Sequence, residues 1–191
     1  MCTNDKINIL KERDVRTYAE MWHTSYVLLE KGLSERKGST HQFRASLVFT
    51  AFTFEAYLNH IGQKIFKCWD SKERLSPKDK LNVISKKIDL EIDYGRRPWQ
   101  VMKSLFGFRN DIAHGKSTKI KEKMKIFPKE LSEGKINQFT EIGWEKYCSK
   151  SNATRAREDV EKMVEELHNA SGIKDEFPFI RGMQISTAEN S

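Results

Sequence analysis

The chain has 191 residues, of which 38% are hydrophobic and 32% charged, and this balance is typical of a soluble globular protein rather than a disordered or membrane-embedded one. A chain of this length favours a single domain, so we expect residues 1–191 to form one unit with its core between about residues 14 and 172. The formal net charge of +7 indicates a polyanionic partner, although many basic proteins have none.

Several other protein classes are disfavoured by what the chain lacks. Its three cysteines are far apart and no cysteine or histidine pair has zinc-ligand spacing, so we expect neither a disulfide framework nor a metal site. No glycine-rich phosphate loop occurs, so we expect no cofactor. The first residues lack the apolar core of a signal peptide, and the most apolar run, residues 45–54, is about half the ~20 residues that span a bilayer. We therefore expect a cytoplasmic protein that does not bind a membrane.

The first half of the chain predicts three helices. Apolar residues recur at helical spacing over residues 14–31, and a polar stretch then breaks the pattern. Residues 41–68 are apolar around most of the helix circumference, which indicates a central, buried helix. Ser76 and Pro77 suit an N-cap and the first helical position, so a third helix is expected to about residue 88.

The second half predicts two more helices separated by an insertion. A fourth helix follows Pro98 and ends near His114, and the helical pattern then lapses between residues 116 and 150. Within this insertion, residues 119–126 alternate with a period of two, so a short strand or an extended arm is expected.

The last helix is expected over residues 152–170, with Gly172 ending it. The polar tail, residues 181–191, is expected to be frayed and flexible. The predicted fold is therefore all-α: a bundle of about five helices with an irregular, partly extended insertion before the last helix.

Glu55 is the only charged residue between Arg44 and Lys64, on the most apolar of these helices. A carboxylate in such a place must be paired or lie in a cleft, because burying it unpaired is costly. We predict a salt bridge with Arg109 on the fourth helix. Glu55 then either orients the two helices or supports catalysis, and both interpretations are open.

The end of the fourth helix carries three polar side chains that suit a phosphodiester. Asn110 and His114 are four residues apart and share a helix face, with Arg109 to one side. Arginine presents a fixed fork of donors to a phosphate, asparagine adds a neutral donor and acceptor, and histidine can transfer a proton near neutral pH. A purely structural interpretation is also open, because the helix dipole favours a histidine in the last turn and Gly115 suits a left-handed residue after it.

The pattern Arg109-Asn110-x-x-x-His114 resembles the Arg-x4–6-His signature of HEPN (higher eukaryotes and prokaryotes nucleotide-binding) domains. Upstream, Phe-Glu-Ala-Tyr-Leu-Asn at residues 54–59 resembles the long second helix of small prokaryotic HEPN proteins. Together the two matches span residues 40–115, and they imply a HEPN-like bundle. One departure is that some relatives have a tyrosine soon after the histidine, where this chain has glycine and lysine, so regulation through such a tyrosine is not carried over.

Seven lysines and three glutamates lie between residues 116 and 135. A run of charge is usually a solvated surface, but this one directly follows the motif, so contact with an RNA backbone is the alternative. The candidate RNA-binding residues are Lys116, Lys119, Lys121 and Lys123.

The resemblance implies an endoribonuclease that needs no metal ion and cleaves RNA by attack of its own 2′-hydroxyl, as in toxins and antiviral defence systems. Arg109, Asn110 and His114 would be catalytic, with Glu55 in support. Such chemistry needs both a base and an acid, so we expect a homodimer that brings two histidines into one cleft. An antitoxin or a defence-system protein is a further expected partner.

Two alternatives to an enzyme remain. The first is a HEPN-fold module that does not cleave RNA but binds RNA or nucleotides, or regulates another protein. The second is a purely structural helical dimer. The second would explain the packing but not the polar trio.

Overall fold

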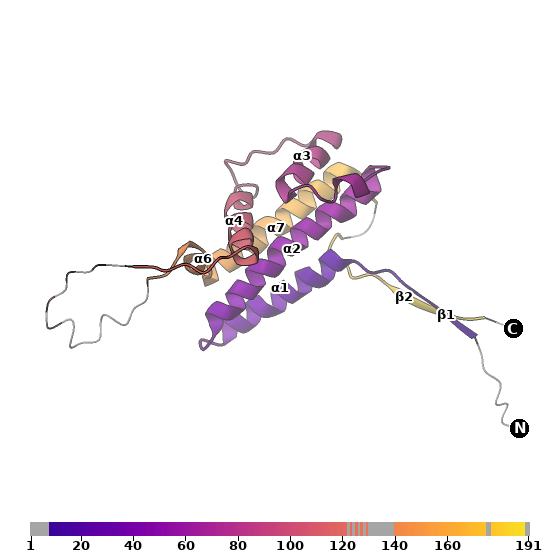
Figure 1. Cartoon of the computed structure of the whole chain (residues 1–191). Coiled ribbons are helices and arrows are strands. Elements are labelled where there is room, and N and C mark those ends of the chain that lie inside the picture. Colours follow the sequence, from indigo (N-terminus) through magenta and orange to yellow (C-terminus); the bar gives the residue numbers. More distant parts are fainter. Residues whose placement is uncertain are drawn as a thin grey trace, which may run out of the picture.

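The structure is a computed structural model that describes residues 8–121, 123, 125, 127, 129, 140–174 and 177–189, and these are mainly helical (Figure 1). The prediction of an all-α fold of about five helices is confirmed. In chain order the elements are β1 (Asn8–Arg13), α1 (Thr17–Ser34), α2 (Ser39–Ile65), the short 3-10 helix η1 (Asp70–Lys72), α3 (Pro77–Lys87), α4 (Val101–Ala113), α6 (Gly143–Tyr147), α7 (Lys150–Ser171) and β2 (Gln184–Glu189).

Helix α2 is the centre of the bundle, as its apolar circumference predicts. It packs against α1 and α7 along its length and also contacts α3 and α4 (Figure 1). Leu47, Phe54, Leu58 and Ile61 of α2 are all completely buried. Because α2 touches all four of these helices, a polar residue on it lies close to its neighbours rather than in bulk water.

Two of the three helix caps that the sequence predicts are present. The Ser76 hydroxyl accepts a hydrogen bond from the backbone N–H of Asp79 at 3.2 Å, with Pro77 at the first position of α3. Helix α7 ends at Gly172, whose φ of +67° is the left-handed conformation that glycine adopts without strain.

Gly115 differs from our expectation, because α4 ends without a left-handed residue. A Cβ at Gly115 would instead stand 2.7 Å from the Asp111 carbonyl oxygen, so it is this close backbone approach that requires glycine.

Another close approach joins α2 to the chain that follows it. The indole of Trp69 is 2% exposed and lies directly on the backbone of Gly62, where a Cβ would stand 2.3 Å from the ring. Glycine here allows a buried tryptophan to close the end of the core.

Two polar contacts attach the start of α4 to α7. Arg97 Nε donates to the buried Asp159 carboxylate at 2.7 Å, and the indole N–H of Trp99 donates to Glu166 at 2.9 Å. These contacts hold the N-terminal end of α4 against the bundle and so define where its C-terminal turn lies.

Two features were not predicted. Strands β1 and β2 form an antiparallel ribbon in which Asn8 pairs with Glu189 and Arg13 with Gln184, and this ribbon extends away from the helices (Figure 1). The chain after residue 181 is therefore a strand over Gln184–Glu189, where we expected a frayed tail. In the insertion, α6 is a helix of five residues that packs against α4.

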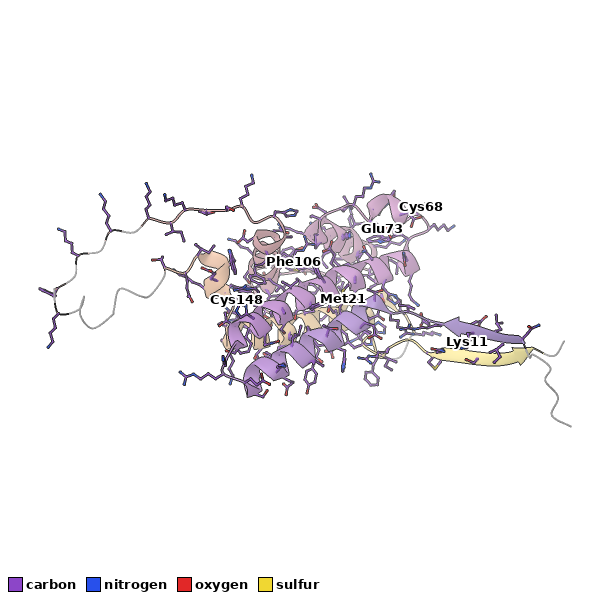
Figure 2. All side chains as sticks on the ribbon, turned by 60° about the horizontal axis from the view of Figure 1, so that its bottom comes forward. Lys11, Met21, Cys68, Glu73, Phe106 and Cys148 are labelled. Atoms are coloured by element: carbon purple, nitrogen blue, oxygen red, sulfur yellow. The ribbon has the colours of Figure 1, made fainter. Side chains whose placement is uncertain are left out.

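The segment that follows α4 is irregular, in agreement with the predicted insertion. Residues 115–121 have no helix or strand and lead away from the bundle, on the side opposite the ribbon (Figures 1 and 2). Of the predicted strand or arm over residues 119–126, residues 122, 124 and 126 lie outside the described chain.

Candidate functional site

The C-terminal turn of α4 presents the predicted trio at the surface. Arg109 is half-buried with a side chain 16% exposed, whereas Asn110 and His114 are exposed. The backbone N–H of His114 donates to the carbonyl oxygen of Asn110 at 2.9 Å, so the two residues are stacked one helical turn apart, as their spacing predicts.

The guanidinium of Arg109 is held in one orientation by residues of α2 and α4. Its Nη2 donates to the Glu55 carboxylate, and its Nη1 donates to Asn110 Oδ1 at 3.0 Å. The aromatic rings of Phe52 and Phe106 lie 5.9 Å from the guanidinium carbon, within reach of a cation–π contact. The predicted Glu55–Arg109 salt bridge is therefore confirmed.

The Arg109 contact also determines how the Asn110 amide is turned. A guanidinium only donates hydrogen bonds, so the atom of Asn110 that faces it must be the amide oxygen. The amide nitrogen of Asn110 then remains as a donor on the exposed side. Arg109 and Asn110 thus act as one unit with donors that suit an anion.

Glu55 has a second cationic neighbour that the sequence analysis missed. Lys80 of α3 is 2% exposed, and its Nζ lies 3.8 Å from Glu55 Oε1. One carboxylate therefore faces two cations, and the cluster of Glu55, Lys80 and Arg109 has a net charge of +1. The signal was available, because Lys80 lies four residues before the buried Ile84 and so on the apolar face of α3.

His114 stands apart from this cluster. Its imidazole makes no hydrogen bond or ion pair with another residue that the structure describes, and it is open to solvent. The structure thus brings Glu55, Arg109 and Asn110 into direct contact, with His114 one turn beyond them.

The candidate RNA-binding lysines lie on the irregular segment after α4. Their side chains are all exposed, and the segment leads away from the helices rather than along the site (Figure 2). Lys135, the last lysine of the predicted basic run, lies outside the described residues. The described lysines of this segment are Lys116, Lys119, Lys121, Lys123, Lys125 and Lys129.

A pocket of about 470 Å³ adjoins the trio, between α4 and the start of α3. Asn110 forms part of its wall, together with Phe106 of α4 and residues from the start of α3. Figure 2 shows Phe106 on α4, far from Lys11 on the ribbon. Sequence reasoning did not find this pocket, because it depends on how α3 and α4 are placed relative to each other.

Within the described part of the chain, no three histidine, cysteine or acidic side chains gather in a way that could hold a metal ion. Cys68 and Cys148 are free thiols, and Cys2 lies outside the described residues. None of the helices that the structure describes has the length and apolar character needed to cross a membrane. No family model, curated protein or solved structure matches this chain.

Proposed function

We propose that the chain is an endoribonuclease that uses the 2′-hydroxyl of RNA as its nucleophile and needs no metal ion. One observation carries the proposal. Glu55 and Asn110 hold the guanidinium of Arg109 in place, and the exposed His114 lies about one helical turn further along α4. The resemblance of this motif to HEPN domains adds to the proposal and remains a resemblance.

The roles follow from the chemistry of RNA cleavage. A base removes the proton of the 2′-hydroxyl, the freed oxygen attacks phosphorus, and the bond from phosphorus to the 5′-oxygen breaks as that oxygen takes up a proton. His114 is suited to proton transfer. Arg109 and the Asn110 amide nitrogen are suited to the negative charge that gathers on the phosphoryl oxygens. The products are a 2′,3′-cyclic phosphate and a 5′-hydroxyl.

The fixed orientation of Arg109 matters for this role. Charge stabilisation is most effective when the donors are already aligned, since no further ordering is then needed at the transition state. Glu55 and the two aromatic rings supply this alignment, so Glu55 acts as a positioning residue rather than as a proton carrier.

One histidine per chain cannot serve as base and acid in the same step. We propose that two chains pair about a two-fold axis, with α4 in the interface, so that one cleft holds two copies of His114 and two of Arg109. An RNA substrate and a neutralising antitoxin or defence-system partner complete the proposed setting, in the cytoplasm.

The test is the cleavage of mixed cellular RNA by the purified chain in EDTA. We expect the wild type to cleave and His114→Ala to lose ~10²–10⁴-fold in rate with an unchanged melting temperature, because the imidazole is exposed. Arg109→Ala should also lose cleavage, with some loss of stability. His23→Ala, an exposed histidine on α1, is the matched control and should cleave as the wild type does.

A second candidate function is RNA binding without cleavage. It is favoured by one observation, that no described residue orients the His114 imidazole. Wild-type protein that binds RNA but leaves it intact, with and without divalent metal, would establish this second function in place of the first.

A further inference from the structure

The pocket beside the trio has two kinds of wall. One is apolar and partly aromatic, with Phe106 of α4 and Tyr94 of the chain between α3 and α4. The other carries positive charge, from Lys78 at the start of α3 and Lys103 of α4. None of the residues that line the pocket is acidic.

We propose that this pocket receives a nucleobase of single-stranded RNA, next to the phosphate that Arg109 holds. The inference rests on the proposed function for the identity of the polymer, and it adds the subsite that chooses where the polymer is cut. Asn110 is the link, because it lines the pocket and is also hydrogen-bonded to Arg109.

The size and the apolar wall fit a flat ring. Small-molecule pockets commonly enclose about 300–1,000 Å³, so 470 Å³ accommodates one base with its ribose. Bases in single-stranded RNA are free to leave their neighbours and stack on aromatic side chains. Phe106 also lies 5.9 Å from the Arg109 guanidinium, so a base on this ring would be adjacent to the phosphate site.

The polar groups of the pocket suit the hydrogen-bonding edge of a base and the negative charge of the phosphates beside it. The Asn110 amide nitrogen is a donor. The Tyr94 hydroxyl donates to Asn82 Oδ1 at 2.7 Å, so its oxygen remains an acceptor. A phenol is protonated at neutral pH, and burial, with secondarily the charge of Asp79, raises the pKa of Tyr94 further above its ordinary value of 10.0. Lys78, with Nζ 5.3 Å from the Tyr94 ring centre, and Lys103 supply positive charge for the flanking phosphates.

The glycine at position 107 supports the binding of a ligand in this pocket. Glycine in the middle of a helix is less favourable than alanine, so its presence usually has a local reason. A Cβ at Gly107 would meet no atom within 4 Å, so close packing is not the reason. Gly107 lines the pocket, and a side chain there would occupy the volume that a ligand needs.

The test fills the pocket and measures nucleotide binding directly. The probes are the four nucleoside 3′-monophosphates, with inorganic phosphate as the base-free comparison, titrated by calorimetry into wild type, Gly107→Leu and Gly143→Leu. Gly143 is the matched control, since it is also a helical glycine with open space at its Cβ, on α6 and outside the pocket. We expect at least one nucleotide to bind the wild type at least about tenfold more tightly than phosphate does, and Gly107→Leu alone to lose that advantage, as base stacking is worth about this much.

A second variant covers the case in which Gly107→Leu does not fold, as judged by circular dichroism. Lys103→Glu changes an exposed side chain and should weaken nucleotide binding to a similar extent. Equal binding of nucleotides and phosphate, or nucleotide binding that Gly107→Leu leaves unchanged, would overturn the inference.

Cleavage mapping separates this inference from the proposed function. If Gly107→Leu cuts RNA at the same bases and the same rate as the wild type does, the base pocket is overturned and the proposed ribonuclease activity still holds. Nucleotide binding that depends on Gly107, in a protein that never cuts RNA, would support the base pocket and overturn the proposed ribonuclease activity.

Discussion

Glu55 is the residue on which the geometry of the site depends most. Its carboxylate is the counter-charge for Arg109 on α4 and for Lys80 on α3, and Lys80 is almost completely buried. The two cations come from different helices, so the same carboxylate also fixes how α3 and α4 approach α2. Loss of this one acid would leave two positive charges close together with little access to water.

We therefore predict that Glu55→Ala lowers the free energy of unfolding by about 3 kcal/mol, near the low end for a broken buried pair because Glu55 is 25% exposed. Urea denaturation measures the change. Glu73→Ala, which removes an exposed acid that interacts only with Gln63 among the described side chains, is the control and should cost less than about 0.5 kcal/mol. Equal costs for the two variants would contradict the assigned role of Glu55.

Cys148 and Tyr147 make the stability of the protein sensitive to alkaline pH. Burial raises the pKa of the Cys148 thiol above its ordinary value of 9.0 and that of the Tyr147 phenol above 10.0. The folded protein therefore keeps protons that the unfolded chain has already lost, and the free energy of unfolding falls as the pH rises through this range. Burial lowers the pKa of Arg157 to about 10, which has the opposite effect, but only above that pH.

We predict that stability in urea falls between neutral pH and about pH 9.5, because the unfolded chain releases these protons at a lower pH than the folded protein does. Cys148→Ala should reduce this fall, whatever its effect on stability at neutral pH. A fall of the same size in the variant would show that the Cys148 thiol is not its source.

At the scale of elements, two helical glycines should respond to substitution in opposite directions. In α2, Gly62 lies under the Trp69 indole, where a Cβ would stand 2.3 Å from the ring, whereas in α4 the Cβ position of Gly107 is open. We predict that Gly62→Ala destabilises the protein by ~1–3 kcal/mol through overpacking, despite the better helix propensity of alanine. Gly107→Ala should stabilise it by ~0.5–1 kcal/mol. Thermal unfolding of the two variants tests the contrast, and a gain in stability for both would contradict the close contact at Gly62.

The long helices could be predicted because each has enough turns for its apolar period to be read. Helix α6, with five residues, is too short for such a period and was missed. The ribbon was missed for another reason, because β1 pairs with a strand at the other end of the described chain and nothing local indicates that partner.

The candidate site could be predicted in part. Glu55 and Arg109 were paired correctly because a single acid on an apolar helix needs a counter-charge. Lys80 was obscured by its exposed neighbours, Lys78 among them, although its spacing from Ile84 places it on the buried face. The base pocket depends on the relative placement of α3 and α4, which no local pattern contains.

At the scale of the whole molecule, the proposed chemistry requires two chains. We predict a dimer in solution, with α4 in the interface, because each chain supplies one motif histidine. Sedimentation equilibrium at the concentration used for cleavage decides the matter. A strict monomer that still cleaves RNA would contradict the shared cleft.

The basic segment after α4 should act on binding rather than on chemistry. Lys119 and Lys121 are exposed on irregular chain beyond the site. We predict that the double variant Lys119→Glu and Lys121→Glu weakens RNA binding and flattens its salt dependence, because fewer counterions are released. Its cleavage rate at saturating RNA should stay near that of the wild type. A salt dependence that does not change would place these lysines outside the RNA path.

The ribbon of β1 and β2 has a mechanical consequence. Residues 8 and 189 are paired at its far end, and both strands lead from there to the bundle (Figure 1). A tension applied between these two residues would peel the strands apart one pair at a time. The force would reach α1 only after the last ladder pair, Arg13 and Gln184, and the adjoining hydrogen bond from the Asp14 N–H to the Met183 carbonyl oxygen had separated. A two-stranded ribbon without a packed face resists such peeling weakly. The ribbon should therefore separate under a small force, while the helices and the site on α4 stay folded.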